Sequence, residues 1–290
     1  MRAGRGAAGA PPDINRRLRG DTAFRATVLG LSFLATVPLA LILLFVVIRG
    51  AASINWQFLT ALPKPMGEAG GGIANAIVGT LILMLIASVV AIPVGVIAGI
   101  FLAERKSSRL GSLARLSIET LMGIPSIVIG LVAYVWVVKP RGHFSALAGG
   151  LALSMIMLPV ITLATQETLL LIPVSLREAA LALGVSYPRM VMKVVLPAGM
   201  SGIVTGVLLA VARAAGETAP LLFTSFGSPY MVTDIRKPMG ALPHTIFVYA
   251  TSPYDDWHSL AWGAAFVLLL LVLVLNVATK VVTSRWKIQF

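Results

Sequence analysis

The sequence predicts an all-α polytopic membrane protein with about six transmembrane helices. Of its 290 residues, 58% are hydrophobic and 12% are charged, a composition far from that of a soluble domain. A helix that crosses the bilayer core, which is roughly 30 Å thick, needs about 20 apolar residues. Six apolar stretches reach this length: residues 26–48, 73–103, 116–138, 144–172, 199–224 and 257–283.

The basic residues predict how these segments are oriented. The formal net charge is +12, from 23 Lys and Arg against 11 Asp and Glu. With both termini in the cytoplasm, 16 Lys and Arg fall on the cytoplasmic side, six fall on the other side, and Arg213 lies within a segment. Cytoplasmic loops of membrane proteins carry the excess of Lys and Arg. We therefore expect both termini in the cytoplasm, and the basic charge is a topology signal that requires no nucleic acid as a partner.

The sequence predicts two parts of different character, residues 1–25 and residues 26–290. The first part is rich in Gly, Ala, Pro and Arg, which is typical of a disordered tail, and its charge favours contact with anionic membrane lipid. The second part is a single transmembrane domain. A cleaved signal peptide is the alternative for the start of the chain, but its apolar core has about 7 to 15 residues. The apolar run at residues 27–48 is 22 residues long, which favours a retained span.

Residue types that bind metals or form disulfides are scarce. The chain has no Cys, which excludes disulfides and thiolate ligands. Of its three His, 143 and 244 fall outside the apolar segments, 258 lies at the start of the last one, and they form no HExxH pair. We expect neither a metal site nor a catalytic residue in this chain.

The loop at residues 173–198 predicts two short helices outside the membrane. Ser175 and Glu178 have the spacing of a capping box, so the first helix is expected to start there. Gly184 follows the apolar positions as a left-handed cap does, and Pro197 is expected to end the second helix. The pattern alone fits two interpretations equally: a rigid projection that receives force from another protein, or an interfacial pair of helices with no special function.

The same loop resembles the EAA loop of ABC importer permeases. The resemblance rests on six positions with the spacing of that motif: Glu178, Ala179, Ala180, Gly184, Leu196 and Pro197. Val194 departs from the motif, where Ile is usual. The resemblance implies the type I ABC importer permease fold. It also implies a coupling loop that docks on a cytoplasmic ATPase subunit and transmits its closure to the membrane helices.

The chain lacks the phosphate-binding loop of an ATPase. It contains no GxxxxGK[ST] motif and no Gly-Lys dipeptide. We therefore expect a transporter subunit that is not itself an enzyme and has no cofactor of its own. ATP and Mg²⁺ are expected on the partner ATPase.

The fifth apolar segment contains a charged pair in the stretch ARAAGETAPL, residues 212–221. An ionisable group at bilayer depth costs about 2.5 to 3.5 kcal/mol. Arg213 and Glu217 are four residues apart, so on one helix their side chains share a face about 6 Å apart and neutralise each other. We expect an anion site, in which the guanidinium binds a tetrahedral oxyanion bidentately and Thr218 adds a hydroxyl. The alternative is a buried ion pair that only fixes helix packing.

Two further segments carry helix interruptions. The stretch IETLMGIPS, residues 118–126, contains Pro125, and the fourth segment contains Pro159. Such interruptions suit helices that line a moving cavity, but membrane helices also tolerate Pro without such a role. The sequence alone leaves both interpretations open.

A second resemblance is to the phosphate-specific importer permeases. It rests on LLAVARAAGETAPLLFTSF and on the upstream GGIANAIVGTL, residues 71–81. KPMGALPHTIF and AWGAAFVLLLLVLVLN resemble the PstA-type subunit more than its PstC-type partner. The match runs from about residue 70 to the end. It implies a bacterial cytoplasmic (inner) membrane protein that translocates inorganic phosphate, with Arg213 and Glu217 in the path. The implied partners are a PstC-type permease subunit, a PstB-type ATPase dimer and an external PstS-type phosphate-binding protein.

Three alternatives to phosphate import remain at this point. A permease for another oxyanion, such as sulfate, molybdate or phosphonate, shares the same features. A membrane enzyme acting on lipid phosphates is disfavoured, because all five Asp lie in the tail or an outside loop and no second carboxylate cluster is present for Mg²⁺. A passive channel or helical scaffold leaves the EAA spacing unexplained.

Overall fold

The regular elements of the structure are helices, as expected. The computed structural model describes residues 14–65, 68 and 70–284, and in them the β structure is limited to an isolated bridge between Phe226 and Met239. The chain divides into two compact units, residues 1–48 and 49–290. The predicted all-α fold class is confirmed.

The first unit contains most of α1, Ile14–Ser53. Its portion Gly20–Ser53 is long and apolar enough to cross a membrane. The helix begins within the segment expected as a tail, whereas residues 1–13 lie outside the described part of the chain. The division into a tail and a permease domain at residue 25 stays a prediction.

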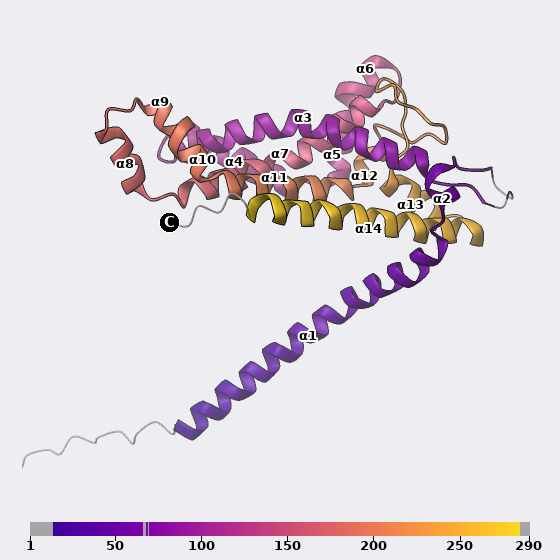
Figure 1. The fold of residues 1–290 in the computed structure, drawn as a ribbon, viewed down its shortest axis with the longest axis horizontal. Coiled ribbons are helices and arrows are strands. Elements are labelled where there is room, and N and C mark those ends of the chain that lie inside the picture. The colour runs from indigo at the N-terminus through magenta and orange to yellow at the C-terminus, as the bar shows by residue number, and fades with distance from the viewer. Residues whose placement is uncertain (1–13, 66–67, 69, 285–290) are drawn as a thin grey trace, which may run out of the picture. The chain divides into compact units, whose positions relative to one another are not determined.

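The second unit is a helical bundle in which the axes of α3, α11 and α14 are roughly parallel, and α11 runs opposite to the other two (Figure 1). Its longer helices are α3 (Ala74–Glu104), α4 (Arg109–Gly123), α7 (Ala146–Leu170), α11 (Met200–Ala215) and α14 (Asp255–Ser284). Its short elements are α2 (Trp56–Thr60), α5 (Ser126–Ala133), α6 (Lys139–Arg141), α8 (Val174–Ala182), α9 (Tyr187–Met190), α10 (Leu196–Ala198), α12 (Ala219–Leu222), α13 (Leu242–Ala250) and π-helical turns at Tyr134–Val138 and Val191–Val195.

Two of the six expected spans are bent. Four helices in the described residues are long and apolar enough to cross a membrane, and the number is six if each of two bent pairs is one span. The first pair, Arg109–Gly123 with Ser126–Arg141, bends by 105°. The second pair, Tyr187–Ala198 with Met200–Ala215, bends by 68°. About six spans is therefore confirmed, but the segments at 116–138 and 199–224 are not single straight helices.

Proline accounts for both interruptions within these segments. Ile124 precedes Pro125 and has an extended backbone, φ −74° and ψ 128°, because the proline ring disfavours the helical region for the residue before it. In the fifth segment, Pro220 lacks an N–H, and in a continued helix its ring would clash with the carbonyl of Gly216. The helix α11 accordingly ends at Ala215, and α12 begins at Ala219.

The helix α7 is the centre of the bundle. Of its most apolar window 67% is buried, against 28% for α3 and 17% for α14. It packs closely on α3, because a Cβ atom on Gly99 would lie 2.5 Å from Thr165 Cβ. It packs closely on α11 as well, where a Cβ atom on Gly202 would lie 2.5 Å from Thr168 Cγ2. Small residues allow this approach of backbones in membrane helices.

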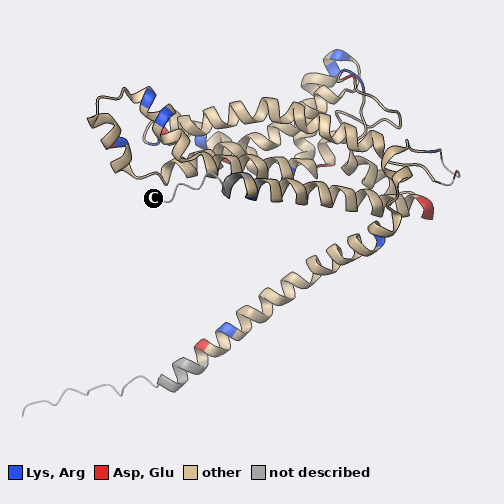
Figure 2. Ribbon diagram, in the orientation of Figure 1, with Lys and Arg blue, Asp and Glu red and all other residues tan. Residues whose placement is uncertain are grey.

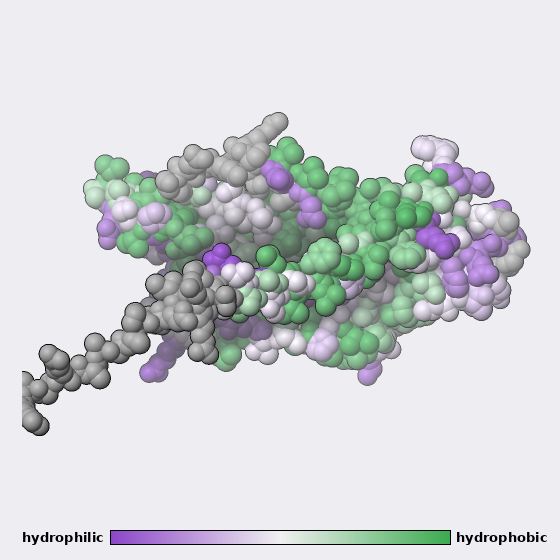
Figure 3. Space-filling model, turned by 90° about the horizontal axis from the view of Figure 1, so that it is seen from below, coloured by the Kyte–Doolittle hydropathy of each residue, from purple (hydrophilic) through white to green (hydrophobic). Residues whose placement is uncertain are grey.

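The helix α3 shows how the bundle presents itself to lipid. Leu83, Ala87 and Ala91 are buried against the bundle, whereas large apolar side chains on the other face are exposed: Leu81, Leu85, Val89 and Ile97. Hydrophobic residues dominate the middle of the face seen in Figure 3, and hydrophilic residues gather toward the ends. In lipid this exposed apolar surface requires no further partner.

The two ends of the bundle differ in structure. The segment α8–α10 lies at one end with the end of α3, and residues 223–241 lie at the other with α13 (Figure 1). Lys and Arg residues occur at both ends and are few along the bundle between them (Figure 2). Hydrogen bonds fix the second end: Asn75 Nδ2 donates to Ser228 O at 2.6 Å, and Leu242 N donates to Thr80 Oγ1 at 2.8 Å.

Candidate functional site

Arg213 and Glu217 line a cavity of about 190 Å³. Its other walls come from the break between α4 and α5, which contributes Pro125 and Ser126, and from the middle of α7, which contributes Pro159. The fold thus brings the charged pair together with Pro125, at a helix break, and with Pro159, where the expected interruption is wrong because α7 continues through it. Their shared cavity favours the interpretation in which the prolines shape a cavity wall.

The two charges of this pair do not meet. Arg213 is in the last turn of α11 and is exposed, whereas half-buried Glu217 lies in the break before α12. Within the described residues no ion pair joins them. The expected pairing on one helical face is wrong, because the helix ends at Ala215 and Gly216 N–H bonds to Arg213 O at 3.2 Å. The guanidinium therefore stays available to a ligand.

The hydroxyl that lines the cavity belongs to Ser126, and not to Thr218 as the sequence suggested. Thr218 is half-buried next to Glu217 but is not part of the cavity lining. Ser126, which the sequence analysis did not single out, does line it. Its signal was its place directly after Pro125, where α5 starts. The helices α5 and α12 that flank the site are in tight contact, since a Cβ atom on Gly130 would lie 2.7 Å from Pro220 Cα.

The first helix of the segment 173–198 starts and ends by different means. The helix α8 begins at Val174 with Pro173 as its N-cap and no side-chain capping bond, so the predicted capping box at Ser175 is wrong. Pro173 has φ −57°, which already suits a helix start. At the other end the prediction is confirmed, because Gly184 has φ +78° and donates to Leu181 O at 2.9 Å.

The second helix of this segment continues beyond its expected end. Tyr187–Met190 leads into the π-helical turn, in which Leu196 N–H bonds to Val191 O, five residues back. Pro197 follows this widened turn, and the helical run ends only after Ala198, at the 68° bend before α11. Pro197 therefore lies inside the helical run, and its expected role as a terminator is wrong.

The surface of α8 exposes both polar and apolar side chains. Glu178, Ala179 and Gly184 are exposed, and Leu183 is 84% exposed, while Ala180 is buried in the bundle. Leu196 and Pro197 lie where the segment rejoins α11: Leu196 is half-buried and Pro197 is exposed. This segment thus exposes several large apolar side chains, Val174, Leu181 and Leu183, as protein-binding surfaces do.

A group of three side chains fastens this segment to the bundle. Arg177 Nη1 lies 2.6 Å from Glu104 Oε1, and Arg177 Nη2 donates to Leu169 O at 3.0 Å. Tyr187 Oη donates to Glu104 Oε2. The Arg177 and Glu104 side chains are 18% and 10% exposed. The sequence analysis missed this group, which joins residues 73 positions apart.

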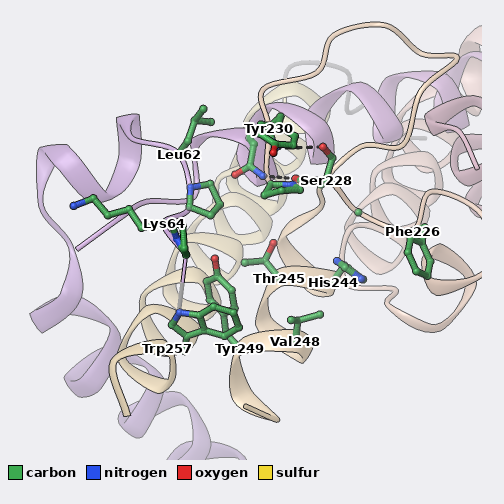
Figure 4. A pocket seen from close by; sticks show the side chains of 16 residues that line it. Leu62, Lys64, Phe226, Ser228, Tyr230, His244, Thr245, Val248, Tyr249 and Trp257 are labelled. Atoms are coloured by element: carbon green, nitrogen blue, oxygen red, sulfur yellow. Dashed lines mark hydrogen bonds between the residues drawn. The ribbon is translucent and has the colours of Figure 1, made fainter. Parts of the chain in front are cut away.

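A larger cavity of about 800 Å³ opens at the other end (Figure 4). Lys64, Tyr230, His244, Tyr249 and Trp257 contribute to its lining. The Tyr249 and Trp257 rings have centroids 4.6 Å apart. Burial lowers the pKa of His244 and raises the pKa of Tyr249. Five separate segments build this cavity, which is why no local pattern indicated it.

The fold and these sites define the class of protein. Over residues 95–288 the sequence matches the family described as binding-protein-dependent transport system inner membrane component. The fold agrees: the chain resembles a subunit of the MetNI methionine ABC transporter, with a TM-score of 0.59, 19% identity and coverage of 75% of this chain and 95% of the other. The chain belongs to this family of importer permeases.

Within the family, the similarity is to PstA-type permeases. The chain is 44% identical to the phosphate transport system permease protein PstA of Yersinia pestis, over 85% of this chain and 84% of the relative. It is 36% identical to the probable PstA protein of Methanocaldococcus jannaschii, over 91% and 94%. It is 34% identical to PstA 1 of Mycobacterium tuberculosis CDC 1551, over 94% and 91%.

Family membership fixes several expectations. The chain is a multi-pass inner-membrane protein and a transport permease rather than an enzyme. As the permease of an ABC importer it works with an ATPase and a binding protein. The alternatives of a lipid-phosphate enzyme and a passive scaffold are not supported. The roles of the individual site residues stay predictions.

Proposed function

We propose that this chain is the PstA-type permease subunit of an ATP-driven importer of inorganic phosphate. The observation that carries the proposal is Arg213, whose guanidinium reaches a cavity between helix breaks without an ion-pair partner among the described residues. The names of the relatives support phosphate over sulfate, molybdate or phosphonate as the substrate.

The chemistry of the cavity suits phosphate. The ion carries about −1.5 charges near neutral pH and needs donors within the membrane. Arg213 offers a planar fork that binds two phosphate oxygens, and the Ser126 hydroxyl lines the same cavity as a further donor. Glu217 accepts a hydrogen bond from the protonated oxygen of phosphate. A fully deprotonated, doubly charged anion such as sulfate has no proton to donate to this carboxylate, which gives the site a basis for discrimination.

The segment 173–198 is the coupling loop of this proposal. Exposed Glu178, Ala179 and Gly184 present a surface to a PstB-type ATPase dimer, on which ATP and Mg²⁺ are bound. Leu196 and Pro197 join the loop directly to α11. A displacement of the loop by the ATPase therefore reaches Arg213 through one helix.

The remaining partners follow from the same proposal. A PstC-type subunit completes the translocation path beside this chain. The 800 Å³ cavity at the opposite end is the docking surface for a PstS-type phosphate-binding protein, since its aromatic rings and Lys64 suit a protein surface with apolar and acidic side chains. This places the cavity outside the cell and both termini in the cytoplasm.

The test is phosphate uptake by the reconstituted complex with Arg213→Ala. We expect uptake and phosphate-stimulated ATP hydrolysis to fall by at least about tenfold, because hydrogen bonds to a charged group are lost. The control is Arg115→Ala, since Arg115 lies in an exposed pair with Glu119 outside the cavity. Full uptake by an assembled Arg213→Ala complex would contradict the proposed site.

A further inference from the structure

The end of α3 is attached to the coupling loop through one carboxylate. Glu104, the last residue of α3, binds Arg177 of α8 at 2.6 Å and also accepts a hydrogen bond from Tyr187 of α9. Both oxygens of the carboxylate are used, one for each helix of the loop. A single side chain thus fixes the angle between α8, α9 and the bundle.

The attachment extends to α7, a second helix of the bundle. The second terminal nitrogen of Arg177 donates to Leu169 O at 3.0 Å, near the end of α7. Removing this charged pair from water costs free energy unless its hydrogen bonds are satisfied, and here the guanidinium and the carboxylate both have further partners. The group is therefore a stiff joint between α3, α7 and α8.

The helices α3 and α7 move as one body. Besides Gly99 against Thr165, a Cβ atom on Gly95 would lie 2.8 Å from Ile161 Cγ2. The backbones are in contact over more than one turn, so a displacement at the end of α3 is carried along α7. Pro159 of α7 is part of the wall of the Arg213 cavity.

We propose that Glu104 is a positioning residue for energy coupling, and that its joint with Arg177 and Tyr187 makes α3 and α7 follow the coupling loop. The inference rests on the proposed function of that loop. Through α10 the loop is continuous with α11, which contributes Arg213 to the cavity. Through Glu104 both helices of the loop are also tied to the end of α3, so that α3 and α7, which contributes Pro159 to the cavity, follow the same motion.

The consequence of breaking the joint is uncoupling. The loop is otherwise joined to the bundle by the chain at Pro173 and at the bend before Met200, and by apolar packing of Ala180, Met190 and Val195. Without the joint the ATPase still docks and hydrolyses ATP, but the loop shifts on this apolar contact and displaces α3 and α7 less. The quantity that changes is the amount of phosphate transported for each ATP.

The experiment compares Glu104→Gln with a matched control in the whole reconstituted complex. Glu119→Gln makes the same change in the exposed pair with Arg115. We expect Glu104→Gln to retain the ATPase on co-purification and to lower phosphate transported per ATP by about fivefold or more, the lower range of coupling energies. Glu119→Gln leaves the ratio unchanged. An unchanged ratio in Glu104→Gln overturns the inference.

A second measurement does not depend on the substrate. The sequence contains no Cys, so Lys106→Cys and Met192→Cys give two unique labelling sites, one beside the end of α3 and one in the loop. The expected label distance is the same with and without ATP when Glu104 is present, and changes with ATP in Glu104→Gln. If the distance between the two labels changes with ATP while Glu104 is present, the inference is overturned.

Two controls separate this inference from the proposed function. If the complex with native Glu104 shows no phosphate-dependent ATP hydrolysis, the proposed function fails while the label distances still test the joint. If Glu104→Gln does not assemble, Tyr187→Phe is used, because it removes only the hydrogen bond from α9 to Glu104. A lower amount of phosphate transported per ATP in Tyr187→Phe supports the joint, and an unchanged amount contradicts it.

Discussion

Two Arg–Glu pairs of this permease differ in whether their charges meet. Arg177 and Glu104 form a 2.6 Å ion pair that is nearly buried and shares hydrogen bonds with Tyr187 and with the backbone. Arg213 and Glu217 line one cavity, and among the described residues they form no ion pair. One pair is complete within the chain, and the other leaves its charged groups free to bind a ligand.

The difference has a backbone cause. Arg177 and Glu104 lie on separate helices whose ends are packed together, so their side chains extend toward each other. Arg213 and Glu217 are close in sequence, but the break before Pro220 turns the carboxylate out of the helical register. The residues close in sequence, Arg213 and Glu217, therefore form no ion pair with each other, whereas the distant residues Glu104 and Arg177 do.

The strongest test of this contrast is thermal stability. Glu104→Gln removes one partner of a nearly buried ion pair and should destabilise the protein by about 2 kcal/mol. Glu217→Gln removes a half-buried carboxylate without an ion pair and should change stability by less than about 0.5 kcal/mol. Thermal unfolding of the purified complex in detergent measures both. Equal losses of stability would mean that the two pairs do not differ in the proposed way.

Gly184 tests whether the coupling loop needs its shape as well as its joint. Valine at φ +78° is strained, because a left-handed backbone costs a residue with a side chain roughly 1 to 2 kcal/mol. We expect Gly184→Val to lower phosphate uptake about tenfold and to weaken ATPase association. The matched control is Gly142→Val, at φ +72° with open space around it, at the opposite end of the bundle. Similar defects in both variants would indicate general misfolding instead.

Two residues with hydroxyl groups test which side chains of the Arg213 cavity bind phosphate. Ser126 lines the cavity and Thr218 does not, although the latter adjoins Glu217 in sequence. Ser126→Ala should reduce phosphate uptake about fivefold, as expected for one hydrogen bond to a charged ligand. Thr218→Val should stay within about twofold of the unsubstituted protein. The reverse order of effects would restore the hydroxyl role that the sequence suggested for Thr218.

Local patterns explain what the sequence predicted well. Hydropathy located all six segments, because a span must be apolar over its length wherever it packs. The glycine cap at 184 was also predictable, since its conformation depends on adjacent residues. The joint at Glu104 was not predictable, because it depends on how α3 and α8 pack. The same reason hid Ser126, whose part in the cavity depends on the 105° bend beside it.

The smallest expected effect concerns the cavity at the α13 end, which is lined by the half-buried imidazole of His244. Burial lowers the pKa of His244, so its neutral form is favoured in the folded protein. The unfolded chain then binds more protons below about pH 6.5, the ordinary pKa of histidine, and stability is lost as the pH falls through that range. His244→Gln should lessen this loss, whereas His143→Gln, at an exposed loop position, should retain it. Melting temperatures between pH 8 and pH 5 measure the difference. If the melting temperatures of both variants fall with pH as much as that of the unsubstituted protein, the His244 imidazole does not control the acid sensitivity of this end.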